Sequence, residues 1–271
     1  MTKVPPVWWR RPRMGAALAL VAIAAIATLV VWPAAPSVSA SPEVATDALL
    51  PDPVEPAFRP AEPHPRAMDA NLTRWAPIVR AVDARVGPGS GRVVGHLDEL
   101  TPEGTTNIAV VTDSAEDPEG RLWARVRLAT LPNNLTGWVP RASLGGYGIV
   151  RTHLVVDRDD LSATLYRGRR VIFRADVGVG QGAYPTPGGR FYVRNKLTRF
   201  ANPAYGPLAF GTSARSAVLT DWPAGGFVGI HGTDRPELLP GRVSHGCIRM
   251  RNEDILRLGR LMPVGTPLTI T

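Results

Sequence analysis

Short runs in which hydrophobic and polar positions alternate make up much of the chain from residue 91 onward. An alternation with a period of two is typical of strands that are buried on one face. Between Leu122 and Leu128 the even positions are apolar, while Arg125 and Arg127 share the opposite face with Trp123. The pattern predicts strands over residues 91–97, 107–112, 121–129 and 136–140, and a helix or an extended lead-in segment over residues 69–85.

A second group of alternating runs follows in the C-terminal half of the chain. It predicts strands over residues 153–157, 164–166, 171–175, 190–193 and 227–231. The interval 198–222 has no clear period and carries Phe200, Tyr205, Phe210 and Trp222, so it is expected to be irregular, either a flap over a site or a packed loop.

One short helix is expected over residues 253–260. Asn252 can cap it, acidic residues begin it and arginines end it, which suits the helix dipole. Ile255, Leu258 and Met262 would face the core. The fold class is therefore mainly β, with one short C-terminal helix.

A continuous apolar stretch near the N-terminus shows neither the alternation of a half-buried strand nor the repeat of an amphipathic helix. Residues 14–32 are nineteen positions without a charge, nearly enough to span a bilayer. Basic residues and no acidic ones occupy residues 1–13, so a single-pass anchor with its N-terminus in the cytoplasm is expected. Val38-Ser39-Ala40 would instead suit cleavage of a signal peptide. Nine prolines in residues 33–65 predict an extended linker, and both interpretations direct the remaining chain to the cell envelope.

The charge balance indicates the kind of partner. The chain carries 31 basic and 23 acidic residues, a net charge of +8, and the surplus lies from residue 146 onward. Nucleic acid is a common partner of basic chains, but the export signal argues against it. We expect an anionic envelope component or an acidic peptide.

Cys247 is the only cysteine of the chain, so it forms no disulfide within it. A cysteine taken alone is most often an inert small hydrophobe. Here Gly246 permits a sharp turn with bare N–H groups, and His231 lies sixteen residues upstream as a possible base. Metal binding is the alternative, because His153, His231, His245 and Cys247 are zinc ligand types. Their spacing completes no tetrahedral set, so no metal and no cofactor is predicted.

The residues around Cys247 resemble a known family. His231-Gly232-Thr233 and Ser244-His245-Gly246-Cys247, with twelve residues between His231 and Ser244, are similar to the signature of L,D-transpeptidase catalytic domains (YkuD-like). Residues 177–180 and 184–191 resemble the glycine strand and the Thr-Pro-x-Gly turn of that family. The resemblance covers about residues 146–271. The preceding region also resembles a bacterial SH3-like barrel. This resemblance is weaker and rests on residues 123–126 and 137–140.

The resemblance implies a role for each signature residue. Cys247 would be the nucleophile, His231 its base, and the Gly232 carbonyl the acceptor that fixes the His231 tautomer. Backbone N–H groups of residues 245–247 would form the oxyanion hole. Substrate-binding roles would fall to Arg249, His245, Gly246 and Ser244, with Arg249 holding a substrate carboxylate.

The expected architecture has five parts: a cytoplasmic N-terminus (1–13), an anchor or signal sequence (14–32), a linker (33–65), a small SH3-like barrel (66–144) and an L,D-transpeptidase-type β-sandwich (145–271). The implied activity is formation of 3-3 cross-links between peptidoglycan stem tetrapeptides in cell wall biogenesis, with carbapenem-type β-lactams acylating Cys247. The alternatives are an L,D-carboxypeptidase, an enzyme that anchors envelope proteins, and a noncatalytic wall-binding module.

Overall fold

The computed structural model describes residues 72–198, 202–220 and 226–271, which all belong to one compact unit of the chain, residues 59–271. The predicted anchor and linker, together with Phe200 and Trp222, lie outside the described residues. Within the described ranges, no helix is long and apolar enough to cross a membrane.

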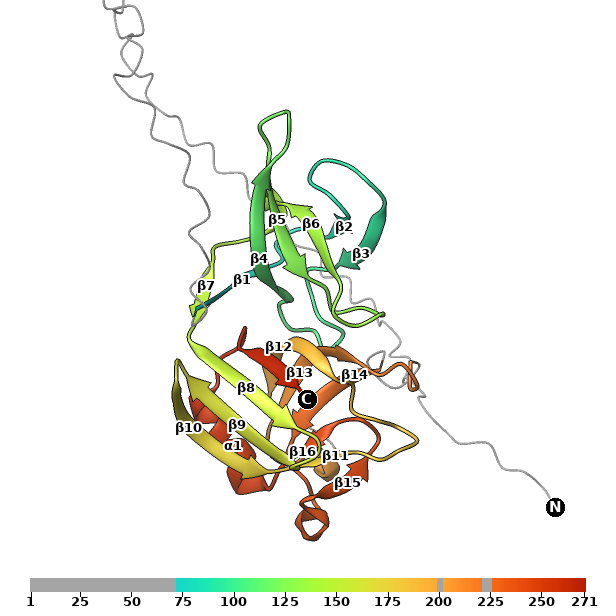
Figure 1. The fold of residues 1–271 in the computed structure, drawn as a ribbon, viewed down its shortest axis with the longest axis vertical. Coiled ribbons are helices and arrows are strands. Elements are labelled where there is room, and N and C mark those ends of the chain that lie inside the picture. Colours follow the sequence, from blue (N-terminus) through green and yellow to red (C-terminus); the bar gives the residue numbers. More distant parts are fainter. Residues whose placement is uncertain (1–71, 199–201, 221–225) are drawn as a thin grey trace, which may run out of the picture. The chain divides into compact units, whose positions relative to one another are not determined.

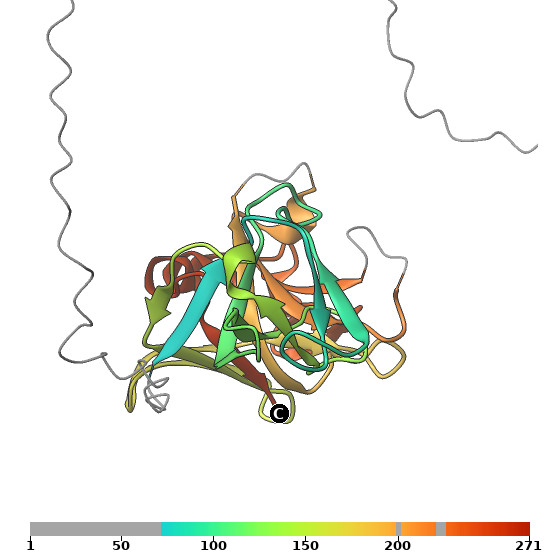
Figure 2. The ribbon, with the colours of Figure 1, turned by 90° about the horizontal axis from the view of Figure 1, so that it is seen from above.

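The first sheet has seven strands in the order β3-β2-β6-β5-β4-β1-β7 (Figures 1 and 2). They are β1 (Thr73–Pro77), β2 (Val82–Arg85), β3 (Val93–Leu97), β4 (Ile108–Glu116), β5 (Leu122–Arg127), β6 (Thr136–Pro140) and β7 (Gly148–Val150). Its core consists largely of small and branched side chains, among them Ala76, Ala124 and Val126. The four strands predicted between residues 91 and 140 are confirmed, and β4 extends further, to Glu116.

Residues 73–77 form β1 and residues 82–85 form β2, so of the two alternatives for this stretch the helix was wrong. β1 lies between β4 and β7 and pairs antiparallel with both. Pairing on two sides satisfies the backbone of a segment that is too short to be stable as a helix. The partners are distant in sequence, which is why no local pattern shows them.

β5 follows the predicted alternation in part, with two exceptions, of which the first is that Leu122 is 61% exposed although it belongs to the apolar face. Ala124 and Val126 are buried and Arg125 is exposed. Trp123, on the polar face, is only 7% exposed, because its indole N–H donates to Asp117 Oδ2 at 2.7 Å. A buried carboxylate therefore lets an aromatic residue occupy the face that the arginines share.

The second sheet has ten strands in the order β10-β9-β8-β17-β12-β13-β14-β16-β11-β15 and curls like half a barrel (Figure 1). They are β8 (Thr152–Asp157), β9 (Ser162–Arg167), β10 (Arg170–Asp176), β11 (Gly178–Gly180), β12 (Gly189–Leu197), β13 (Ala209–Arg215), β14 (Phe227–His231), β15 (Gly241–Ser244), β16 (Ile248–Arg249) and β17 (Pro267–Ile270). The five strands predicted for this half are confirmed, and β14 has the predicted bounds.

β13 corrects the expectation for the interval 198–222. It is a central strand between β12 and β14, preceded by the short 3-10 helix η2 (Pro203–Tyr205). All its residues except Arg215 are buried, including Phe210. A strand covered on both faces has no reason to alternate, so its composition did not indicate a strand.

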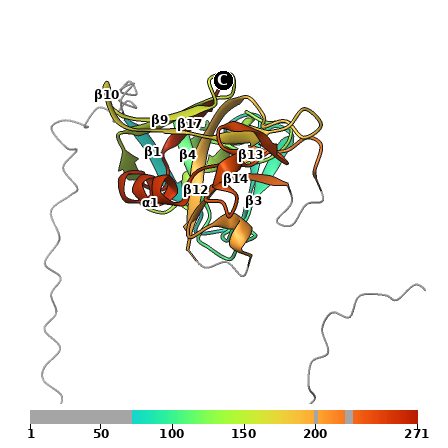
Figure 3. The ribbon, with the colours of Figure 1, turned by 90° about the horizontal axis from the view of Figure 1, so that it is seen from below.

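The helix α1 (Asn252–Leu261) is confirmed, and Ile255, Leu258 and Met262 are buried as predicted. It packs beside β10 (Figure 3), where the Arg257 guanidinium donates to the Arg174 carbonyl at 3.1 Å.

The predicted cap of α1 was wrong. The helix begins at Asn252, and Arg251 occupies the N-cap position without a side-chain hydrogen bond. The Asn252 side chain instead contacts the segment after His231, as described below.

Polar contacts join the two sheets. The buried Tyr192 hydroxyl on β12 donates to the Ile108 carbonyl on β4 at 3.0 Å, and burial raises the pKa of Tyr192 to about 12. Arg194, 2% exposed, pairs with Glu103 at 3.3 Å. Asn133 exchanges two hydrogen bonds with the Arg215 backbone, at 2.7 and 3.0 Å.

Candidate active site

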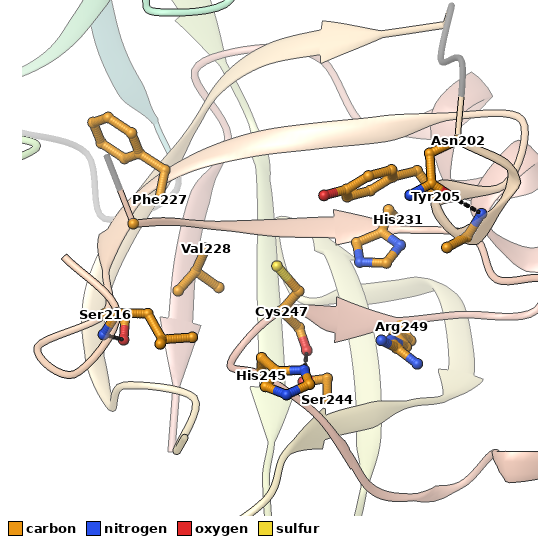
Figure 4. Close-up of a pocket in the computed structure, with 13 residues that line it drawn as sticks. Asn202, Tyr205, Ser216, Phe227, Val228, His231, Ser244, His245, Cys247 and Arg249 are labelled. Carbon is orange, nitrogen blue, oxygen red and sulfur yellow. Dashed lines mark hydrogen bonds between the residues drawn. The ribbon is translucent and has the colours of Figure 1, made fainter. Parts of the chain in front are cut away.

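Two neighbouring strands bring His231 and Cys247 to one pocket (Figure 4). β14 ends at His231, and β16 begins directly after Cys247. The strands pair in parallel, with His231 opposite Arg249, and the Met250 N–H donates to the His231 carbonyl at 2.9 Å. The predicted nucleophile and base, separated along the chain, are therefore neighbours in the sheet.

The His231 ring is fixed by its own neighbour in sequence. Nδ1 lies 2.6 Å from the Gly232 carbonyl oxygen, and because a carbonyl only accepts, Nδ1 must carry the proton. Nε2 then has a free lone pair, which is the form a general base requires. Burial lowers the pKa of His231 to about 4; the Gly232 hydrogen bond opposes this shift and the Arg249 charge adds to it.

The Cys247 thiol is half-buried and receives the Gly229 N–H, 3.4 Å from Sγ. Burial raises the pKa of Cys247, while the Gly229 N–H and the Arg249 charge oppose that shift. With the thiol pKa raised and the imidazole pKa lowered, the resting pair is neutral at pH 7, not a thiolate and an imidazolium. Proton transfer is thus left to the moment of attack.

The turn before Cys247 is held from inside by Ser244. Its buried hydroxyl donates to the Cys247 carbonyl at 2.5 Å and accepts the Gly246 N–H at 3.1 Å. Gly246 adopts φ 110°, a conformation that side chains disfavour. Ser244 lines the pocket, but its hydroxyl is engaged within the turn, and so is the Gly246 N–H. Both act on the shape of the turn.

Thr186, a buried residue of the segment between β11 and β12, also holds this turn. Its hydroxyl donates to the Gly246 carbonyl and accepts the Gly180 N–H, both at 2.8 Å. The exposed ring of His245 lies against Tyr184, with ring centroids 4.8 Å apart. Sequence reasoning placed His245 and Gly246 at the site but gave Thr186 no role beyond its place in a family turn.

Arg249 extends the pocket with a positive charge. It lies beside His231 in the sheet and lines the pocket with Cys247. Its Nε atom is buried and has no hydrogen-bond partner among the described residues. A desolvated donor of this kind can bind a carboxylate strongly.

The pocket has a volume of about 170 Å³, and the segments before β13 and β14 supply part of its wall. Tyr205 of η2 contributes a ring whose centroid lies 4.9 Å from that of His231. Sequence reasoning counted Tyr205 among the aromatic residues of a possible flap without linking it to His231. The preceding Asn202 and Pro203, a turn signal, could have suggested a bend there.

Asn252 supports the Gly232 segment and was also missed. Its Oδ1 atom accepts the Thr233 N–H at 3.0 Å. A Cβ placed on Gly232 would lie 2.3 Å from that oxygen and 3.1 Å from the Gly206 Cα. The close approach of Gly206, Gly232 and Asn252 joins η2, the end of β14 and the start of α1 behind the His231 ring.

Within the described ranges, no three His, Cys, Asp or Glu side chains gather as a metal site. His153, one of the four ligand types considered above, does not line the pocket of Cys247. Its Nε2 atom lies 2.8 Å from the Thr269 hydroxyl, on another part of the sheet.

Comparisons with known proteins find one family that matches the C-terminal part of the chain. Residues 151–270 match the YkuD family, the L,D-transpeptidase catalytic domain. The "Putative L,D-transpeptidase YkuD" of Bacillus subtilis (strain 168) is 36% identical over 118 residues, which cover 44% of this chain and 65% of that protein. The chain thus spans slightly less than two thirds of the length of this relative.

Two solved structures are also among those that the chain matches. The Ldtfm-avibactam carbamoyl enzyme is 27% identical, with coverage of 44% of this chain and 48% of that one and a TM-score of 0.35. LD transpeptidase LdtMt1 in complex with imipenem is 18% identical, with coverage of 72% and 100% and a TM-score of 0.37. From the family match and the identity to the Bacillus protein, residues 151–270 are an L,D-transpeptidase catalytic domain of the YkuD family.

Proposed function

We propose that this protein is a cysteine-dependent L,D-transpeptidase that forms 3-3 cross-links between peptidoglycan stem tetrapeptides. The observation that carries the proposal is the Nδ1 hydrogen bond from His231 to the Gly232 carbonyl at 2.6 Å, in the pocket that also holds Cys247. It leaves Nε2 as a base beside the only thiol of the chain.

In the acylation step, His231 Nε2 takes the thiol proton as Cys247 Sγ attacks the carbonyl carbon between the third, L-centred residue and the terminal D-residue. The carbonyl oxygen becomes an oxyanion, stabilised by backbone N–H groups of the nucleophile turn. Because the Gly246 N–H donates to Ser244, we assign this role chiefly to Cys247 N–H. The C–N bond then breaks, the leaving amine takes the proton from His231, and a thioester remains.

In the second step an acceptor amine attacks the thioester carbonyl and gives a proton to His231, which returns it to the departing sulfur. A second stem peptide as acceptor gives the cross-link. Water as acceptor gives an L,D-carboxypeptidase, and an amine of an envelope protein gives an anchoring enzyme. The same site serves all three reactions.

Arg249 is the proposed ligand for a carboxylate of the stem peptide. Its buried Nε donor supports this assignment, and the positive charge of the residues from 146 onward would attract an acidic peptide. We assign His245 to the rim of the substrate site, and Ser244 and Gly246 to holding the turn.

The same thiol would react with carbapenem-type β-lactams. Attack by Cys247 Sγ on the strained lactam carbonyl opens the ring, the lactam nitrogen takes the thiol proton through His231, and a thioester forms. Family membership and the accessible pocket support this expectation.

For the remaining chain we propose a single-pass or cleaved N-terminal segment that places the enzyme on the outer face of the plasma membrane or in the cell wall. Residues 66–144 would be an SH3-like module that packs against the catalytic domain (145–271). The sequence patterns above support both proposals.

The test is incubation of the full-length protein with a disaccharide tetrapeptide that contains diaminopimelate, followed by intact-protein and product mass measurement. A thioester and a cross-linked dimer are expected in the wild type and neither in Cys247→Ala. A tripeptide product without a cross-linked dimer would mean that water resolves the thioester and that the enzyme is a hydrolase, not a transpeptidase. No adduct with either the tetrapeptide or a carbapenem would contradict a catalytic role and favour a wall-binding module.

A further inference from the structure

A second and larger hollow lies where the first sheet meets the second. It has a volume of about 550 Å³ and is lined by residues of β1, β4 and β5 on one side and of β8, β12 and β17 on the other. None of the residues that line it also lines the pocket of Cys247. We refer to it as the inter-sheet cleft.

Three arginines line the inter-sheet cleft: Arg127, Arg151 and Arg190. No acidic residue is among the described residues that line it, and none of the three guanidiniums forms an ion pair within the described part of the chain. The Arg127 guanidinium donates to the Arg190 carbonyl at 3.0 Å, which holds it across the junction.

The charges are close enough to affect each other. Burial and then the Arg190 charge lower the pKa of Arg127, and the same two causes lower the pKa of His153 in the cleft. The half-buried Arg127 guanidinium and the exposed Arg190 guanidinium therefore repel each other in the unliganded protein, and a bound anion would relieve that repulsion.

A contact at the same junction shows how this chain neutralises an arginine when no ligand is involved. Arg194 on β12 pairs with Glu103 at 3.3 Å, and Glu103 also accepts from Asn195 at 3.0 Å. The inter-sheet cleft has three guanidiniums and no carboxylate counterpart of this kind. An anionic ligand can supply the negative charge that the described lining residues lack.

The other lining groups narrow the class of anion. The Thr73 hydroxyl can donate to an anionic oxygen, while Phe191 and Leu268 supply apolar wall. Guanidiniums bind phosphate in a two-pronged geometry, and a phosphate monoester carries about 1.5 to 2 negative charges, more than one carboxylate. The volume leaves room for a small organic group beside the phosphate.

We propose that the inter-sheet cleft is a binding site for the phosphate group of a phosphorylated polyol or sugar, held by Arg127, Arg151 and Arg190. The phosphate is a monoester, either of a free small molecule or at the end of a polymer, because an internal diester carries only one negative charge. The inference does not depend on the proposed transpeptidase activity, because the cleft and the pocket share no lining residue.

The test is titration calorimetry of the full-length protein with glycerol 3-phosphate and with a poly(glycerol phosphate) oligomer that ends in a phosphate monoester. Arg151→Gln and Arg190→Gln should each weaken binding by at least about tenfold, since each removes a charged hydrogen-bond donor. Arg151→Gln is the cleaner variant, because the Arg151 side chain is exposed and forms no hydrogen bond within the described residues. Binding of the ester assigns the site to free esters, and binding of the oligomer alone assigns it to a polymer.

Two matched variants locate the site. Arg260→Gln removes an exposed arginine from α1, outside the cleft, and Arg249→Gln removes the arginine of the catalytic pocket. Both should bind phosphate with an affinity within about twofold of the wild type, because they lie outside the cleft. Melting curves of all variants show whether each is folded.

The proposal is overturned if folded Arg151→Gln and Arg190→Gln bind as the wild type does, or if neither probe binds the wild type. It is also overturned if Arg249→Gln alone loses binding, which would place the phosphate in the catalytic pocket. Equal affinity for tricarballylate, which carries carboxylates only, would overturn the assignment to phosphate.

Discussion

The pocket of Cys247 and the inter-sheet cleft handle charge in opposite ways. In the pocket, burial raises the pKa of the thiol and lowers that of the imidazole, so both reactive groups rest neutral beside one guanidinium. In the cleft, three guanidiniums are gathered with no carboxylate among the described lining residues. The two reactive groups of the pocket carry no charge at rest, whereas the cleft accumulates charge.

The difference follows from what each hollow is suited to do. A reaction needs charge only while bonds change, and a neutral resting pair loses less hydration when the substrate enters. A binding site for an anion needs its charge in place beforehand. The pocket should therefore depend on the position of single atoms, whereas the cleft should depend on the sum of its charges.

Cys247→Ser provides the strongest test of the pocket. We expect turnover of the tetrapeptide to fall by at least about a thousandfold, because a hydroxyl is a far weaker nucleophile than a thiolate. Product masses from timed incubations measure this loss, and the melting temperature should stay near that of the wild type. Turnover close to the wild-type rate would remove Cys247 from the mechanism.

His231→Ala tests the base. Acylation should slow by about 10²- to 10⁴-fold, the usual contribution of a positioned general base. The measurement is the rate of carbapenem adduct formation by intact-protein mass, with Arg260→Gln as a folded control. An unchanged adduct rate in His231→Ala would mean that the thiol is activated by another group.

The neutral state of His231 should appear in the pH dependence of stability. Its folded-state pKa is about 4 against 6.5 for the ordinary side chain. The contribution of this ring to the free energy of unfolding is fully present above pH 6.5 and is lost as the pH falls through about 4. The reason is that the histidine of the unfolded chain takes up its proton at a higher pH than the buried ring does. The loss should amount to about 3 kcal/mol.

Chemical denaturation between pH 7 and pH 4 measures this loss. The wild type should show the full decline, and His231→Ala should lack the part that belongs to this ring. The same decline in both proteins would show that His231 is not buried in its neutral form, and would weaken the contrast between pocket and cleft.

Asn252→Ala should have the smallest of these effects. Loss of the bond to Thr233 would loosen the Gly232 carbonyl and lower kcat by about tenfold with little change in KM, since substrate contacts remain. Asn252→Asp, which keeps an acceptor oxygen, should retain most activity, and Glu253→Ala in the same helical turn serves as control. An equal loss in Glu253→Ala would indicate a general effect on α1.

Much of this fold was predictable because its strands alternate. β14 and α1 were found from period and end signals, and Ile255 and Leu258 were placed in the core correctly. β13 was not found, because a strand buried on both faces carries no alternation. β1 and β2 were missed because their stability comes from pairing with distant strands.

For the site, the resemblance of the segments around His231 and Cys247 to one family motif implied that the two residues form a pair. Asn252 was predicted as a helix cap, a local role that its residue type suggests, but its oxygen contacts Thr233 across the fold. Tyr205 approaches His231 only through tertiary structure. Contacts of this kind depend on how separate segments meet, which local patterns do not specify.

The place of β17 in the second sheet has a consequence for the order of events during synthesis on the ribosome. β17 lies between β8 and β12 and is the only strand that joins one group of paired strands, β8–β10, to the other, β11–β16, within the described sheet. Yet it is the last strand of that sheet to be translated. A growing chain therefore holds both groups as unconnected fragments, and the pocket, although its residues are already present, is assembled on a complete sheet only after residue 270 has emerged.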